Sequence, residues 1–200
     1  MRRFRLASMA SSEDTFARLV SLAVHDLRTP LATVSGFART LQRTSLGDPT
    51  DRYVEMMVAA SNQLADLLDD VGLVSRIESG RWEPNVQEAD SLELARDALH
   101  EVPGARIEGE GATVRVDRDA AATALRQLTT CALRHGGLDE VEVSVKGGDI
   151  TIAPIVESAA PIVLGEEPRD LGAMIAGRIL PALGGGRELD GDRLLVRLPT

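Results

Sequence analysis

Cysteine and long apolar runs are scarce in this 200-residue chain, and each scarcity excludes a class of protein. Cys131 is the one cysteine, so the chain has no internal disulfide, and this thiol cannot form a metal cluster with its sequence neighbours. Such sparing use of cysteine is typical of proteins in the reducing cytoplasm. No apolar run approaches the roughly 20 residues that cross a bilayer, so we expect no membrane-spanning helix.

Positive charge is also scarce, because 22 basic residues stand against 31 acidic ones and leave a formal net charge of -9. Non-specific nucleic-acid binders usually carry a basic stripe, so this balance argues against that class, although acidic charge alone identifies no partner. The opening stretch Met1–Arg5 is basic, but no apolar segment of signal-peptide length follows it. We expect residues 1–13 to form an N-terminal tail that leaves no room for a sensor domain.

Two stretches have the apolar spacing of long helices, and they are joined by the turn Gly47-Asp48-Pro49. In each, apolar residues recur in alternating steps of four and three, which places them in a heptad seam along one side of a helix. The first seam consists of Phe16, Val20, Ala23, Leu27, Val34, Phe37 and Leu41, with Pro30 at its one missing step. The second seam consists of Tyr53, Met57, Ala60, Leu64, Leu67, Val71 and Val74.

Residues 14–80 are therefore predicted to form an antiparallel helical hairpin, with its first helix at about 14–43 and its second ending near Gly80. One hairpin cannot bury both flanks of its apolar stripes. We expect two copies of the chain to associate into a dimeric four-helix bundle.

His25 lies in the first helix, two residues from both Ala23 and Leu27 of the seam. The helical period therefore places it on the side opposite the seam, facing water. Asp26 is positioned to hydrogen-bond the imidazole and fix its tautomer, which leaves the other ring nitrogen as a nucleophile near neutral pH. Thr29 follows one turn later on the same face, where its hydroxyl can orient a water molecule or a phosphoryl oxygen.

Four other polar residues have less specific interpretations. Arg18 and Arg28 lie on the more polar side of the first helix and are candidates for contact with an acidic partner, although an exposed charge is more often simply solvated. His100 and His135 are interpreted as structural, because neither has cysteine or acidic ligands at metal spacing in the sequence.

The remainder of the chain predicts a second domain at residues 91–200, after a linker at residues 81–90 that contains Trp82 and Pro84. Helices alternate with strands here, so the half is α/β or α+β and the whole chain is α+β. The expected helices are 91–100, 119–135 and 169–183, and the expected strands are 105–108, 113–116, 141–145, 150–155, 187–189 and 193–198.

Two motifs resemble bacterial sensor histidine kinases. The segment His25-Asp26-Leu27-Arg28-Thr29-Pro30-Leu31 is similar to the phosphoacceptor motif of that family, and the segment Leu67-Leu68-Asp69-Asp70-Val71-Gly72-Leu73-Val74-Ser75-Arg76-Ile77-Glu78-Ser79-Gly80 resembles the end of the second helix of the same dimerisation module. The resemblance implies that His25 is phosphorylated, that Asp26 assists proton transfer and that Thr29 belongs to the phosphatase motif.

The second half resembles the ATP-binding domain of the same kinases, as a small α/β sandwich with altered nucleotide motifs. Cys131 occupies the place of the family's magnesium-binding asparagine, and a neutral thiol is a poor ligand for magnesium. Residues 155–161 replace the family's aspartate and two glycines, a short connector with Pro168 replaces its glycine-rich lid, and Gly172 alone resembles its glycine box. We therefore expect a degenerate domain, without a cofactor or metal ion bound by this chain.

These features predict a cytoplasmic histidine phosphotransfer protein of a two-component phosphorelay, most like the dimeric histidine phosphotransferases. His25 passes a phosphoryl group between the aspartates of response-regulator receiver domains, and the receiver supplies Mg²⁺. Such a chain is a phosphotransferase through phosphohistidine, without ATP-dependent autophosphorylation. Two alternatives stay open: an ATP-dependent sensor-type histidine kinase with an atypical nucleotide pocket, and a non-catalytic dimeric scaffold that binds a response regulator.

Overall fold

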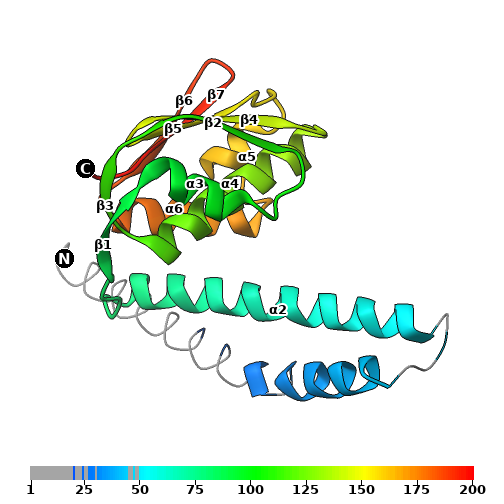
Figure 1. Cartoon of the computed structure of the whole chain (residues 1–200). Coiled ribbons are helices and arrows are strands. Elements are labelled where there is room, and N and C mark those ends of the chain that lie inside the picture. The colour runs from blue at the N-terminus through cyan, green and yellow to red at the C-terminus, as the bar shows by residue number, and fades with distance from the viewer. Residues whose placement is uncertain (1–19, 21–23, 25–26, 30, 45–46, 48–49) are drawn as a thin grey trace, which may run out of the picture. The chain divides into compact units, whose positions relative to one another are not determined.

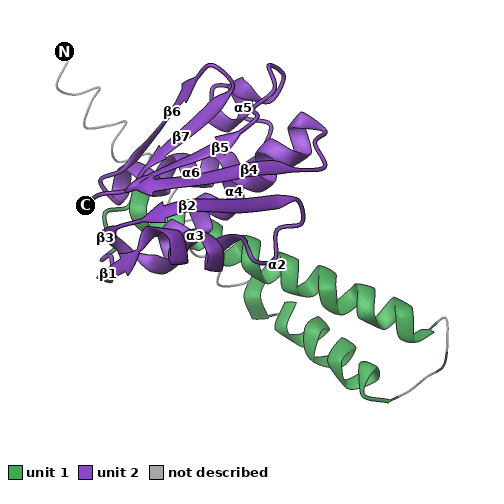
Figure 2. Cartoon of the chain, turned by 45° about the horizontal axis from the view of Figure 1, so that its top comes forward, with its two compact units in different colours: residues 1–82 green, residues 83–200 purple. Residues whose placement is uncertain are grey.

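The computed structural model describes residues 20, 24, 27–29, 31–44, 47 and 50–200 (Figure 1). The chain divides into two compact units, residues 1–82 and residues 83–200 (Figure 2). Within the described residues, no helix combines the length and the apolar character that crossing a membrane requires.

The first unit is a helical hairpin, as the sequence predicts. Residues 31–42 are helical, as are the described residues before them, while the expected start of this helix near residue 14 lies outside the described part of the chain. The second helix is α2, Thr50–Glu78. Asp51 in its first turn and Arg76 in its last turn complement the helix dipole.

Contacts between the two helices show that they run antiparallel. Arg28 pairs with Asp69, whereas Arg39, further along the first helix, donates from Nη2 to Asn62 Oδ1 at 2.9 Å, earlier along α2. Gly72 is buried, and a Cβ atom there would lie 3.4 Å from Val24 Cγ1, so the small residue lets the helices approach closely.

Many large apolar side chains of the predicted seam are exposed on the hairpin, whereas Leu67, Val71 and Val74 near the end of α2 are half-buried. Between the helices, the buried side chains are short or branched, with Val24, Ala38 and Val54 at 7%, 0% and 3% exposure. The seam does not join the two helices of one chain. The large apolar residues that remain 42–69% exposed are Leu27, Val34, Phe37, Leu41, Tyr53, Met56, Met57 and Leu64.

The second unit contains a five-stranded sheet in the order β2-β4-β5-β7-β6. Its strands β2 and β4 are parallel, and the other neighbouring strands are antiparallel. Buried and more exposed residues alternate along β4, β5 and β7, as they do in a sheet with one covered face. In chain order the strands are β2 (Ala105–Gly111), β4 (Val141–Gly147), β5 (Asp149–Ala153), β6 (Gly186–Asp190) and β7 (Arg193–Arg197).

Helices α3 (Ser91–Leu99), α4 (Arg118–Gly136) and α6 (Leu171–Ala182) cover that face of the sheet (Figure 1). The layer between helices and sheet is fully apolar at its centre, where Leu125, Leu128, Ile152, Ile179 and Leu194 are all 0% exposed. The prediction of an α+β chain, with a helical hairpin followed by an α/β sandwich, is confirmed.

The predicted linker at 81–90 is wrong in its second half, because Val86–Asp90 forms strand β1. This strand pairs antiparallel with β3, Thr113–Asp117, and makes a separate two-stranded sheet. Only Ala89 of β1 is buried, so the sequence carries no apolar alternation to indicate a strand. A short helix, α5 (Ala160–Leu164), is also missing from the predicted elements, since its five residues are too few for a helical period to be visible.

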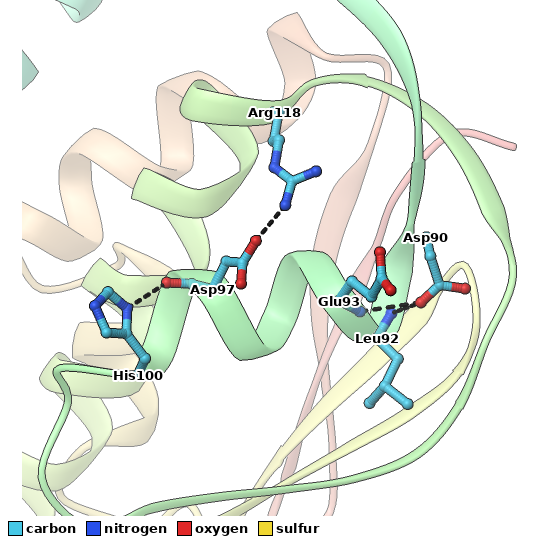
Figure 3. A network of polar contacts seen from close by, with 6 residues as sticks. All are labelled: Asp90, Leu92, Glu93, Asp97, His100 and Arg118. Carbon is cyan, nitrogen blue, oxygen red and sulfur yellow. Dashed lines mark hydrogen bonds and ion pairs between the residues drawn. The ribbon is translucent and has the colours of Figure 1, made fainter.

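Helix α3 is fixed at both ends by polar contacts (Figure 3). Asp90 caps its start, with Oδ1 accepting from the backbone N–H of Leu92 at 2.9 Å and of Glu93 at 3.0 Å. His100 follows its last turn, where ring Nδ1 donates to the carbonyl oxygen of Asp97 at 2.8 Å. The Asp97 carboxylate in turn pairs with Arg118 at the start of α4.

Candidate functional site

Of the candidate phosphoacceptor segment, residues 25–31, the structure describes residues 27–29 and 31, which are helical. His25, Asp26 and Arg18 fall outside the described residues, so their side chains have no structural description here. The described residues nearest to them on the C-terminal side, residues 27–29, are helical and exposed.

Thr29 has an exposed position on this helix, open to a molecule that approaches from solvent. Its carbonyl oxygen accepts a hydrogen bond from Thr33 Oγ1 at 3.2 Å, one turn further on. Thr29 is therefore available to a group that binds on this side of the helix.

Arg28 forms an ion pair within the chain. Its Nη2 contacts Asp69 Oδ1 on α2, and the two side chains are 53% and 65% exposed. Ion pairs this exposed typically contribute less than about 1 kcal/mol to folding. The pair joins the segment around residue 25 to the second motif of the hairpin and leaves half of the Arg28 side chain accessible.

A second candidate site lies in the other unit, where α4 meets the start of α6. Cys131, on α4, is 1% exposed. Burial and, to a smaller degree, the negative charge of Asp170 raise the pKa of the Cys131 thiol to about 12. The metal-free thiol is therefore protonated at neutral pH, and it is neither a nucleophile nor a ligand for a hard cation.

Asp170 occupies the N-terminus of α6 and makes polar contacts in two directions. Oδ1 accepts from the backbone N–H of Ala173 at 2.9 Å, while Oδ2 lies 3.0 Å from His135 Nε2 and 3.3 Å from Arg134 Nη1. The Asp170 side chain is 5% exposed. A helix N-terminus attracts anions such as phosphate, and here the protein's own carboxylate satisfies it.

The glycine that resembles a nucleotide-binding glycine packs against another side chain. A Cβ atom at Gly172 would lie 2.1 Å from Gln127 Oε1, so the Gln127 amide lies directly against the first turn of α6. Asp170 therefore accepts one backbone N–H at this helix start, and the Gln127 side chain packs against the first turn.

The two segments that the sequence analysis expects in place of nucleotide loops are short and internally bonded. Ile155 and Ala159 are 4% and 0% exposed, and the Ile155 N–H donates to the carbonyl oxygen of Asp192 at 2.7 Å. Between α5 and α6, the carbonyl oxygen of Pro161 accepts from Glu166 and Glu167 N–H groups at 2.9 and 3.1 Å. A connector held in this way differs from a flexible lid.

Arg187, at the start of β6, is a structural residue that the sequence analysis missed. It donates from Nη1 to the carbonyl oxygen of Ala173 and from Nη2 to that of Leu164, each at 2.8 Å. Burial lowers the pKa of this guanidinium. Arg187 thereby ties β6 to the end of α5 and the start of α6, and no sequence pattern around it indicates this role.

Cys131, His135 and Asp170 bring one potential metal-ligand atom each to within 4.8 Å of one another. Cys131 and His135 are four residues apart on α4 and share one face of it. The interpretation of His135 as a residue without a cysteine or acidic ligand at metal spacing therefore differs from the structure, in which Cys131 and Asp170 both lie close to it. The Cys-x-x-x-His spacing was visible in the sequence, but only the fold brings Asp170 to it.

Comparison with known proteins identifies the first unit. Residues 17–80 match the model of the His Kinase A (phospho-acceptor) domain. The chain is 28% identical over 145 residues to the histidine protein kinase DivJ of Caulobacter vibrioides, which covers 68% of this chain and 24% of that protein. It is 27% identical over 173 residues to the signal transduction histidine-protein kinase AfsQ2 of Streptomyces coelicolor, covering 78% of this chain and 32% of that protein. The chain thus spans between a quarter and a third of these relatives.

The fold has a counterpart among solved structures. The full-length structure of ShkA in complex with AMPPNP matches with a TM-score of 0.64 at 20% sequence identity, over 90% of this chain and 45% of that one. At this level of identity the likeness concerns the fold alone.

Proposed function

We propose that this chain, which has a bacterial histidine kinase core, is a histidine phosphotransfer protein that works without ATP. His25 receives a phosphoryl group from the aspartate of one response-regulator receiver domain and passes it to another. Asp26 assists proton transfer at the imidazole, and Thr29 lies where it can orient water or a phosphoryl oxygen. Arg18 and Arg28 contact the receiver.

The observation that carries this proposal is the contrast between a matched phospho-acceptor domain and an altered nucleotide site. The model of the His Kinase A domain matches residues 17–80. In the other unit, Asp170 and Gln127 lie against the start of α6, and Cys131 is a protonated, buried thiol. A phosphoryl group that comes from a receiver requires only an exposed nucleophile in line with the aspartyl phosphate. The receiver then provides the Mg²⁺ ion, and this chain provides no cofactor.

Two copies of the chain form the functional unit in this proposal. The large apolar residues along the outside of the hairpin, led by Phe37 at 69% exposure, form a patch that a second copy would cover. A symmetric pair of hairpins buries the same stripe from both chains in a four-helix bundle. Its location is the cytoplasm, where receiver domains and reduced thiols occur together.

A second candidate function is an ATP-dependent histidine kinase with an atypical nucleotide pocket. The names of the relatives favour it, because DivJ and AfsQ2 are both described as histidine kinases. It requires the contacts of Asp170 and Gln127 at the start of α6 to open, so that phosphates reach the backbone N–H groups.

A phosphotransfer assay separates these functions. Purified chain is incubated with labelled ATP and Mg²⁺ in one reaction and with a labelled, phosphorylated receiver domain in another. The matched variants are His25→Gln, which removes the acceptor nitrogen, and His100→Gln, which alters an exposed histidine outside the site. We expect acid-labile label on the chain only from the receiver, lost in His25→Gln and retained in His100→Gln.

Label that arrives from ATP alone would overturn the proposal and support the kinase. Binding of the receiver without label from either source would support a non-catalytic scaffold. The receiver could also lose its label to solvent as inorganic phosphate. If Thr29→Ala abolished this release, hydrolysis would be shown to compete with transfer.

A further inference from the structure

The cluster of Cys131, His135 and Asp170 in the second unit takes no part in the proposed phosphotransfer. Its three potential ligand atoms lie within 4.8 Å of one another. We propose that these three side chains form a zinc-binding site that joins α4 to the start of α6. The proposal is independent of whether His25 is phosphorylated.

The types of ligand select the metal. A thiolate, an imidazole and a carboxylate are the three protein ligands that Zn²⁺ commonly takes, whereas Mg²⁺ and Ca²⁺ require oxygen ligands. In tetrahedral zinc sites, bonds of about 2.0 to 2.3 Å put neighbouring ligand atoms about 3.3 to 3.8 Å apart. His135 Nε2 and Asp170 Oδ2 are 3.0 Å apart and all three ligand atoms lie within 4.8 Å of one another, so the side chains must close around the ion to reach this geometry.

The surroundings hold the three ligands in position. Cys131 and His135 project from successive turns of α4, whose backbone fixes their separation. Asp170 binds the Ala173 N–H through Oδ1, which orients the carboxylate and leaves Oδ2 directed at the cluster. Groups that hold a ligand from behind in this way commonly strengthen metal binding. His135 is 23% exposed, so a water molecule can reach the fourth position.

The charges near the cluster set the proton balance of zinc binding. When zinc binds, the sulfur–hydrogen bond of Cys131 breaks, its proton leaves to the buffer and a sulfur–zinc bond forms. The thiolate and the Asp170 carboxylate then neutralise the two charges of the ion. Arg134 and Arg187 are cations near Cys131 that favour its thiolate, while their positive charges repel the zinc ion itself. Arg134 competes directly for Asp170 Oδ2, but its side chain is 63% exposed and is able to turn toward solvent.

The test uses the full chain, stripped of metal by a chelator, with Zn²⁺ or Co²⁺ alone as the probe. We expect one zinc ion per chain by competition with a chromophoric chelator. We also expect Co²⁺ to produce a sulfur-to-cobalt charge-transfer band in the near ultraviolet. Because Cys131 is the one cysteine of the sequence, that band identifies the sulfur ligand without any variant.

Four variants complete the test, each checked for folding by circular dichroism. Cys131→Ser should abolish the band and weaken zinc binding by more than roughly 100-fold, and Asp170→Asn, which can still cap α6, should weaken it by at least roughly 10-fold. Arg134→Gln should strengthen binding severalfold, because a competing cation is removed. His100→Gln, the matched control outside the cluster, should leave affinity unchanged.

Absence of the cobalt band from the wild-type protein would overturn the proposal, as would zinc affinity that Cys131→Ser leaves unchanged. Zinc bound through His25 instead would be revealed by loss of binding in His25→Gln, and would overturn it equally.

Discussion

The two units of this chain bury their apolar side chains in opposite ways. In the hairpin, Phe37, Met56 and Leu64 are more than half exposed, while Ser61, Asp70 and Ser75 are buried. In the second unit most large apolar side chains, such as Leu125 and Ile152, are inaccessible to water, although Leu171 and Met174 of α6 are 51% and 43% exposed. Apolar burial is the main favourable contribution to folding. The second unit therefore has a well-buried core of its own, whereas the hairpin leaves much of its apolar surface open to association.

The largest effect is expected from a charge placed among the exposed apolar residues of the hairpin. Phe37→Glu puts two carboxylates into a symmetric dimer interface, and we expect the dissociation constant to rise by at least roughly 1,000-fold, about 4 kcal/mol for the pair. Sedimentation equilibrium over a range of protein concentrations measures the change. Gln42→Glu adds the same charge to an exposed position on the same helix and should leave the dimer intact. A wild-type protein that is monomeric throughout the range would contradict the expectation.

A matched pair of leucine truncations compares the two kinds of surface directly. Leu125→Ala leaves a cavity in a fully buried site and should lower the free energy of unfolding of the second unit by about 2 to 5 kcal/mol. Leu64→Ala, at a residue 53% exposed, should destabilise the hairpin by an amount that depends on protein concentration, since its contacts lie in the dimer. Urea denaturation at two protein concentrations distinguishes them. Equal, concentration-independent losses would show that the stripe is not an interface.

The metal-free second unit should also lose stability at high pH because of Cys131. Burial raises the pKa of this thiol from 9.0 to about 12, so the unfolded chain releases the thiol proton first as the pH rises. The stabilisation is fully present below pH 9.0 and is lost progressively toward about pH 12. Urea denaturation at about pH 8 and about pH 10.5 measures the effect. Between these two pH values the free energy of unfolding should decline less in Cys131→Ala than in wild type. An identical decline in both proteins would rule out the thiol as its source.

The smallest expected effect concerns a polar group in the apolar core of the second unit. Among the described residues, Thr129 Oγ1 is a buried side-chain oxygen with no hydrogen-bond partner. Thr129→Val replaces this hydroxyl by a methyl group of similar size, and we expect a gain of about 1 kcal/mol in the free energy of unfolding. Thr130→Val, at the neighbouring and more accessible residue, should change it less. Thermal unfolding in the absence of metal measures both, and destabilisation by Thr129→Val would imply a partner for the hydroxyl.

Most elements of the fold could be predicted from local patterns. The heptad spacing predicts the hairpin, and the alternation of short apolar runs with capped helices predicts the order of the sandwich. The boundaries of β4, β5, β6 and β7 lie within a few residues of those expected. Strand β1 could not be predicted, because it exists through hydrogen bonds to β3, a segment distant in the sequence, and has one buried residue.

The residues of the candidate sites also divide into those that a local sequence motif reveals and those that only the fold brings together. His25, Asp26 and Thr29 belong to one short sequence motif, so sequence reasoning suffices to propose them. Asp170 was not selected, although it caps α6, because its contact with His135 joins residues 35 apart in the chain. Arg187 is a similar case, since its two acceptors are backbone carbonyl oxygens that have no signature in the sequence.

The sequence by itself determined the periodic features of this protein: two helices with an apolar stripe, a histidine motif on the first helix and an alternating second domain. These follow from the fixed periods of helix and strand, which act over a few residues. The tertiary structure alone decided which face of the hairpin stays exposed. It also decided that a carboxylate closes the start of α6 and that Cys131, His135 and Asp170 meet. Those outcomes depend on distant segments packing together, and no local pattern encodes such a contact.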